Sequence, residues 1–181
     1  MTQVSRKEKL IDNMCVMEGF NPKVVHTLTT MLLVHYRNGV QTSALFRPSL
    51  TKEEEQAQHT EMRRDFLDAI QLPIDESKEY QDRLFQNLRD CPWMRPLIDL
   101  VLDEIAETID EGQSYKDIIT MYYLIDDSLS NEDIAYHLGY STASLERKKR
   151  AAIKCFGISM YRYANRIELE EREKNSHDGN E

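Results

Sequence analysis

The residues of this chain whose types and spacing could bind a ligand are gathered in one basic segment. Between residues 140 and 166, seven Lys or Arg residues stand against the single acid Glu146, which gives a local net charge of +6. Four of the seven are consecutive, as Arg147-Lys148-Lys149-Arg150. Clustered cations bind phosphate groups, so this segment favours a nucleic acid as the ligand.

The remainder of the chain is acidic, so the total charge hides the basic segment. The 181 residues carry a net charge of −9, and the residues outside the basic segment therefore carry −15. Residues 99–133, directly upstream, contain eleven acids and one base, Lys116. An acidic body repels DNA and limits non-specific binding. The charge distribution predicts a molecule in which one end binds nucleic acid.

The composition predicts a helical protein. Hydrophobic residues make up 40% and charged residues 30% of the chain, with only six Gly and five Pro. These values exclude collagen-like, low-complexity and wholly disordered chains, and the scarcity of turn residues argues against an all-β sandwich. We expect an all-α fold with a helical N-terminal region and a C-terminal helix-turn-helix.

Neither a membrane nor a secretory route is indicated by the sequence. The longest apolar run, Met31-Leu32-Leu33-Val34, is far shorter than the roughly 18 residues of a membrane span, and the N-terminus lacks a secretory signal. The three cysteines, Cys15, Cys91 and Cys155, are widely spaced and form no CxxC pair. We expect a cytoplasmic protein with reduced thiols and no membrane partner.

Catalytic and metal-binding motifs are not evident. The sequence contains no phosphate loop, nucleophile elbow or His-Glu-x-x-His motif, and its five histidines do not cluster. We expect no enzyme activity, no cofactor and no metal.

Helix signals around the basic segment show how it would be positioned. Ser114-Tyr115-Lys116-Asp117 has the form of a capping box and predicts a helix that runs to Ile125. Ser130-Asn131-Glu132-Asp133 is a second capping box, and the short helix that it opens ends at Gly139. Ser141 is expected to cap a third helix over residues 142–156.

This pattern is typical of a helix-turn-helix. A small residue, Ala135, stands where the two helices would cross closely, Gly139 permits the positive φ that ends the first helix, and Leu145 reaches back towards it. The expected scaffold residues are Ile134, Ala135, Leu138, Gly139, Leu145 and Ala152. The face expected to point outwards, into a DNA major groove, consists of Thr142, Ser144, Arg147, Lys148 and Ala151.

About a quarter of the chain resembles a known family. Residues 129–141 together with Leu145, Arg147, Lys148 and Ala152 closely resemble region 4 of bacterial sigma factors. More narrowly, the arrangement is similar to the small phage and prophage transcription regulators of Gram-positive hosts, the ArpU/RinA-like group, which place a sigma-like helix-turn-helix near the C-terminus. The sigma region that melts a promoter is not visible. The resemblance implies base contacts from Thr142, Ser144, Arg147 and Lys148, and phosphate contacts from Ser141, Lys149, Arg150 and Lys154.

Helix and breaker signals divide the rest of the chain. Residues 1–38 are expected to form a helical pair, whose second helix is capped by Asn21 and ends at Asn38-Gly39. Residues 39–50 are expected to be a loop or hinge. Residues 51–112, which open with the capping box Thr51-Lys52-Glu53-Glu54, are expected to be a central helical region. The helix-turn-helix domain would occupy residues 113–167, followed over residues 168–181 by frayed helix that passes into an acidic, disordered tail.

The leading hypothesis is a sequence-specific transcription regulator of phage, prophage or mobile-element genes. It would read double-stranded DNA with the helix 142–156. We expect it to act as a homo-oligomer, preferably a dimer. Its N-terminal helices would oligomerise or contact RNA polymerase. One alternative is a DNA-recognition protein like the small subunit of a phage terminase, which ring-shaped oligomers would favour. Another is an adaptor that binds a polymerase or regulator through the acidic stretch, which salt-insensitive binding to a protein would favour.

Overall fold

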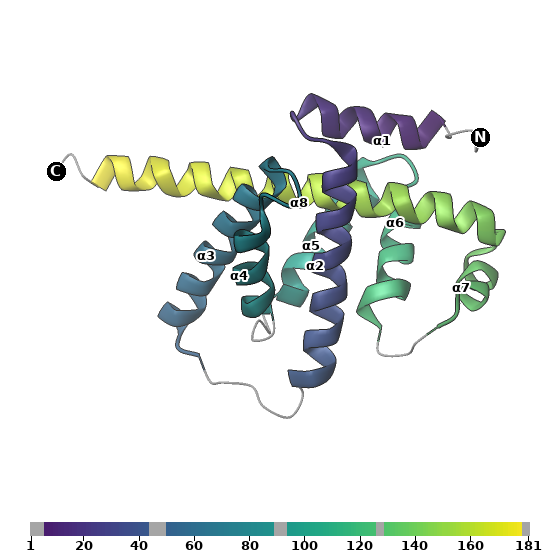
Figure 1. Cartoon of the computed structure of the whole chain (residues 1–181), viewed down its shortest axis with the longest axis horizontal. Coiled ribbons are helices and arrows are strands. Elements are labelled where there is room, and N and C mark those ends of the chain that lie inside the picture. The colour runs from purple at the N-terminus through teal and green to yellow at the C-terminus, as the bar shows by residue number, and fades with distance from the viewer. Residues whose placement is uncertain (1–5, 44–49, 89–93, 126–128, 179–181) are drawn as a thin grey trace.

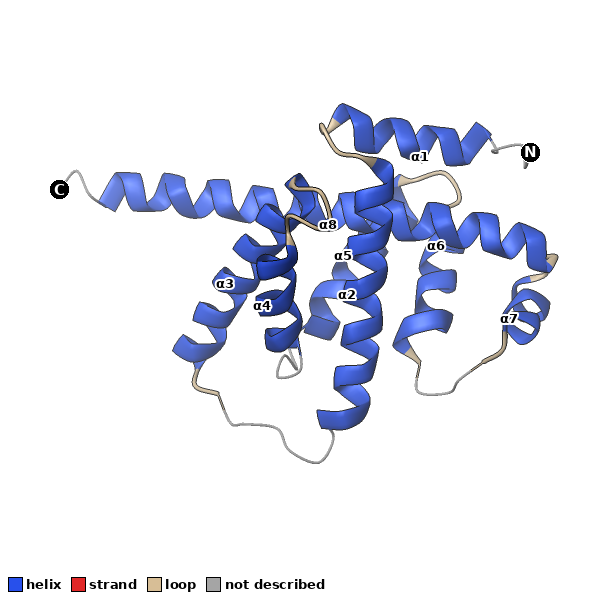
Figure 2. Ribbon diagram, in the orientation of Figure 1, coloured by secondary structure: helices blue, strands red, loops and turns tan. Residues whose placement is uncertain are grey.

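The described part of the chain is entirely helical. The structure, a computed structural model, describes residues 6–43, 50–88, 94–125 and 129–178, and these contain no strand (Figure 2). The predicted all-α class is confirmed. None of the described helices combines the length and apolar character needed to cross a bilayer. The elements are α1 (Arg6–Met17), α2 (Pro22–Ser43), α3 (Lys52–Gln71), α4 (Lys78–Leu88), α5 (Met94–Thr108), α6 (Gly112–Ile119), the π-helical turn η1 (Thr120–Leu124), α7 (Asn131–Leu138) and α8 (Thr142–Asp178).

The long helix α8 is the axis on which the other helices pack. It crosses the whole molecule, with α1 along one side, α7 beneath its first turns, and α2, α3, α5 and α6 against its middle part (Figure 1). Residues 151–158 are all buried. Because a helix that is covered on every side needs no polar face there, this stretch lacks the one-sided apolar stripe of a surface helix.

The sequence predicted that the helix beginning at residue 142 ends at residue 156, and this was wrong. α8 continues without interruption through Gly157. A Cβ atom at Gly157 would lie 2.2 Å from Thr29 Oγ1 and 3.0 Å from Val25 Cγ1 of α2. The glycine is therefore explained by the close approach of α2 and not by a helix stop.

The predicted disorder was wrong for residues 168–178, where the expected frayed helix is instead the regular last turns of α8. The Glu168 carboxylate is buried and is bound by Arg63 at 3.1 Å and Arg64 at 3.2 Å, both from α3. Burial opposes its ionisation, but the hydrogen bonds and charges of the two arginines outweigh this and hold the pKa of Glu168 below its ordinary value. This ion pairing extends the helix; residues 179–181 lie outside the described part.

The boundaries of the N-terminal helices were predicted in part. The Asn21 side chain accepts a hydrogen bond from the Lys23 backbone N–H at 2.9 Å, and Thr51 and Glu54 form the expected capping box. α2, however, continues beyond Asn38-Gly39 to Ser43, so the expected hinge at residues 39–50 begins inside a helix. Residues 44–49 of that hinge lie outside the described residues.

The predicted helix start at Ser114 was wrong. α6 begins at Gly112, and its N-cap Glu111 has a φ of 65° and makes no side-chain cap. A Cβ atom at Gly112 would lie 1.9 Å from the Ile105 carbonyl oxygen, so the tight corner between α5 and α6 determines the helix start. The predicted single helix to Ile125 instead passes from α6 into η1.

The two described cysteines are buried and form no disulfide. Burial raises the pKa of Cys15 to about 11 and that of Cys155 to about 12, so both are neutral thiols at physiological pH. Cys91 lies outside the described residues.

The close approach of α2 and α8 predicts that Gly157→Ala destabilises the fold. The added methyl group must displace Thr29, and overpacking of this kind costs about 1–3 kcal/mol. Thermal unfolding followed by circular dichroism measures the effect.

Thr29→Ala provides the control for this prediction. The Thr29 hydroxyl is buried without a hydrogen-bond partner in the described structure, so its removal alone should change stability little. Combined with Gly157→Ala, it should restore part of the lost stability because the clashing oxygen is gone. A Gly157→Ala protein that unfolds at the wild-type temperature would contradict the packing described here.

Candidate nucleic-acid interface

The helix signals around residues 130–144 are those that the sequence predicted. The Ser130 hydroxyl accepts a hydrogen bond from the Asp133 backbone N–H at 3.1 Å, and the Asp133 carboxylate accepts one from the Ser130 N–H at 3.2 Å. Gly139 has a φ of 69° and ends α7. The Ser141 hydroxyl accepts a hydrogen bond from the Ser144 N–H at 3.2 Å at the start of α8. Two short-range caps and one glycine therefore fix a three-residue turn between α7 and α8.

The side chains expected to join these two helices lie on their inner faces. Of this set, Leu138 is half-buried and Gly139 forms the turn, and the buried members are Ile134, Ala135, Leu145 and Ala152. α7 packs on α8, so the start of α8 is held by apolar contacts on this side.

Tyr122 links three elements beneath the start of α8. Its hydroxyl donates to Asn131 Oδ1 at 2.8 Å, and Asn131 Nδ2 donates to Glu146 Oε1 at 3.3 Å. The Lys149 ammonium lies 3.7 Å from the centroid of the Tyr122 ring. Burial lowers the pKa of Lys149. The structure therefore places Lys149, a predicted phosphate contact, against η1.

Tyr140 ties the turn to α6. Its hydroxyl lies 2.8 Å from the Ser114 hydroxyl, and the Lys148 ammonium lies 5.0 Å from the centroid of its ring. Lys148 also forms an ion pair of 2.8 Å with Glu111, which binds Lys7 of α1 at 2.8 Å as well. Lys148, a predicted base contact, is thus held towards the start of α6.

The open side of α8 contains only part of the predicted set. Ser141, Thr142 and Arg150 are exposed, whereas Ser144 and Arg147 are half-buried. The Arg147 guanidinium donates to the Ser144 hydroxyl at 3.3 Å. Two neighbouring residues outside the predicted set are also accessible: Ala143 is exposed and Glu146 is half-buried.

Ala151 was expected on the outward face, and this was wrong, because it is buried. The N-terminal part of α1 lies beside it: Lys7, Glu8 and Ala151 line the same groove. The sequence pattern could not show that another helix reaches this side of α8.

Acidic side chains of α1 bind cations of α8 along their contact. Glu8 pairs with Arg150 at 3.2 Å, and Asp12 binds Lys154, whose residue is only 7% exposed. Glu18, which directly follows the last residue of α1, pairs with Arg162 of α8 at 2.7 Å. The one available sequence signal was the matching spacing of four residues between Glu8 and Asp12 and between Arg150 and Lys154. The structure places Lys154, a predicted phosphate contact, inside this pairing.

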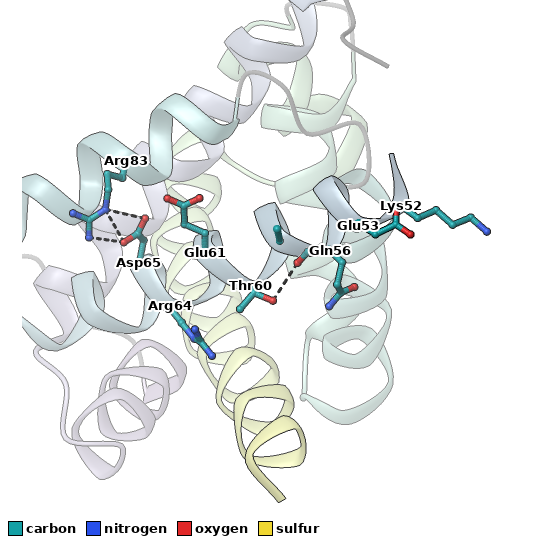
Figure 3. A pocket seen from close by; sticks show the side chains of 9 residues that line it. Lys52, Glu53, Gln56, Thr60, Glu61, Arg64, Asp65 and Arg83 are labelled. Atoms are coloured by element: carbon teal, nitrogen blue, oxygen red, sulfur yellow. Dashed lines mark hydrogen bonds and ion pairs between the residues drawn. The ribbon is translucent and has the colours of Figure 1, made fainter. Parts of the chain in front are cut away.

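Two hollows elsewhere on the molecule lack the excess of cations that is found at the start of α8. A shallow hollow of about 910 Å³ on α3 is lined by three cations and three acids, and Arg83 binds Asp65 there at 2.7 Å (Figure 3). A smaller cavity of about 260 Å³ has a largely apolar lining that includes Met62, Phe66 and Met160. In the described residues, no group of three or more His, Cys, Asp or Glu side chains is placed to hold a metal ion.

Comparison of the chain with family models, curated proteins and solved structures found no match.

The Glu111 contacts predict a pH dependence of stability. Burial opposes the ionisation of Glu111, but hydrogen bonds from Lys148 and Lys7 outweigh it and hold its pKa below the ordinary value of 4.5. A carboxyl group whose pKa is lowered by folding stabilises the fold fully at pH values above its pKa in the unfolded chain. This contribution is lost as the pH falls through its pKa in the folded chain. Glu111→Gln should lower the melting temperature at pH 7 and flatten its decrease below about pH 5.

Melting temperatures measured from pH 7 to about pH 3 check this prediction. Glu104→Gln, which removes an exposed carboxylate from α5, is the matched control and should follow the wild-type curve. A Glu111→Gln protein with the wild-type pH dependence would refute the role of these contacts.

Proposed function

We propose that this chain is a sequence-specific transcription regulator that binds double-stranded DNA. In this proposal α7 and α8 form a helix-turn-helix, and the first two turns of α8 enter the major groove. The observation that carries the proposal is the accessible start of α8, where Ser141, Thr142 and Ala143 are exposed and are followed by Arg147 and Arg150. An α-helix is about 10–12 Å wide with its side chains, which matches the roughly 12 Å width of the major groove.

Arg147 is the residue that we expect to contribute most to sequence recognition. A guanidinium can donate two hydrogen bonds to a guanine, and the Ser144 hydroxyl already contacts Arg147 from one side. Thr142 and Ser144 can hydrogen-bond to base edges, and the Ala143 methyl group can contact a thymine methyl group. We assign phosphate contacts to Ser141 and Arg150, which give affinity without sequence choice.

The three lysines of the predicted set have a different role in this proposal. Lys148 binds Glu111, Lys149 lies on the Tyr122 ring, and Lys154 binds Asp12. These contacts hold the first half of α8 against α6, η1 and α1. We therefore propose that the lysines position the recognition surface, while the arginines contact DNA, Arg150 through the guanidinium nitrogens other than the Nε that binds Glu8.

The resemblance to the ArpU/RinA-like regulators supports phage, prophage or mobile-element genes as targets.

Selection from a random duplex library, followed by sequencing of the retained fragments, identifies the preferred site. Enrichment of one motif supports the regulator, whereas binding that is insensitive to salt and directed to a protein would support the adaptor. Ring-shaped oligomers would favour the terminase-like alternative.

The assignment of Arg147 predicts a large loss of specific binding on substitution. Arg147→Ala should weaken binding to the selected duplex by about 10- to 100-fold, since a bidentate base contact contributes about 1–3 kcal/mol of discrimination. Fluorescence anisotropy with labelled duplex measures this. Arg166→Ala removes an exposed arginine from the other half of α8 and should leave binding unchanged. Equal affinity of wild type, Arg147→Ala and Arg150→Ala would reject the proposed surface.

We also propose that the regulator binds DNA as a dimer. One helix-turn-helix makes few base contacts, and two copies on half-sites about 34 Å apart would compensate for this. Large apolar side chains are exposed on α1, including Met17 at 86%, Val16 at 62% and Leu10 at 57%. Sedimentation at micromolar concentration, with and without the selected duplex, should show a dimer in at least one condition. A monomer in both would exclude dimerisation.

A further inference from the structure

A basic groove lies between the beginning of α1 and the beginning of α8. Its volume is about 690 Å³. α1 contributes Arg6, Lys7, Glu8 and Lys9, α8 contributes Ser144, Arg147, Lys148 and Ala151, and Glu111 and Tyr115 complete the lining. The groove therefore adjoins the side chains to which we assign base contacts, and α1 forms its other wall.

The charges of this groove do not cancel. Five cations and two carboxylates line it, and a third carboxylate, that of Asp110, binds Lys7 at 3.1 Å, so two positive charges remain in excess. Both lining carboxylates are already bound: Glu8 by Arg150, and Glu111 by Lys7 and Lys148. The other three cations of the groove are Arg6, Lys9 and Arg147. In the described structure, no carboxylate lies within ion-pair distance of them.

α1 is held firmly enough to present these cations at a fixed place. Its inner face buries Ile11 and Cys15, and Glu8 and Asp12 bind cations of α8. Figure 1 shows α1 alongside the first half of α8, with its N-terminus towards the same end of the molecule as the start of α8. Arg6 and Lys9 lie one helical turn apart on α1, and both are exposed.

We infer that the N-terminal turn of α1 is a second DNA contact, in which Arg6 and Lys9 bind backbone phosphates beside the major groove that α8 occupies. This inference rests on the proposed function and assigns α1 a part in it. The acids of α1 hold the helix against α8, while its cations at positions 6 and 9 face the DNA. Contacts of this kind fix the orientation of a protein on the duplex but carry no sequence information.

The test is the double variant Arg6→Gln/Lys9→Gln, with Lys52→Gln/Lys78→Gln as the matched control. The control removes the same charge from exposed positions on α3 and α4. Binding of the selected duplex is measured by anisotropy between 50 and 200 mM salt. Each lost phosphate contact reduces the slope of log K against log salt by about 0.9, so the double variant should have a slope shallower by about 1.8. Its preference among duplex sequences should equal that of the wild type, and the control should keep the wild-type slope.

The outcomes separate this inference from the proposed function. If the wild type shows no salt-dependent binding to any duplex, the proposed function fails and the inference fails with it. If the wild type binds with a steep slope and the Arg6→Gln/Lys9→Gln variant keeps that slope, or binds more tightly, α1 makes no phosphate contact and the inference alone fails. Thermal unfolding of both double variants shows whether a loss of binding reflects a loss of fold.

Discussion

The burial of α8 on all sides is the constraint on which the rest of the structure depends. A helix with residues 151–158 all buried must be surrounded, and α1, α2, α5 and α6 supply that surround. Gly157 permits the close approach of α2. Because the middle of α8 is fixed in the core, its first two turns are carried at a fixed angle at the edge of the molecule. A recognition surface built on such a helix needs little ordering before it binds.

Ion pairs between an acidic body and a basic helix explain the charge pattern of the sequence. Acids of α1 and the N-cap of α6 do not simply repel DNA, since Glu8, Asp12 and Glu111 bind cations of α8 or α1. An ion pair with a buried lysine, such as Lys154 with Asp12, adds little net stability, but breaking it is costly, so it specifies how α1 lies on α8. The cations left on the open side then define the surface that we propose for DNA.

Features that depend on neighbouring residues could be predicted from the sequence. The caps at Thr51 and Ser130 and the helix end at Gly139 involve only contacts within a few residues. Features that depend on residues more than 100 positions away could not. The helical end beyond Glu168 requires Arg63, and the burial of Lys154 requires Asp12. The same limit applies to the candidate site: its caps and apolar scaffold followed from local spacing, whereas the groove formed with α1 did not.

NMR spectroscopy of the labelled chain, titrated with the selected duplex, tests the central claim most directly. Backbone amide signals report contacts along the whole chain in one experiment. We expect shifts concentrated at Ser141, at residues 142–150 of α8 and at residues 6–9 of α1, with the signals of α3 and α4 unchanged. Shifts confined to α3 and α4, or no shifts at a duplex concentration that saturates binding, would contradict it.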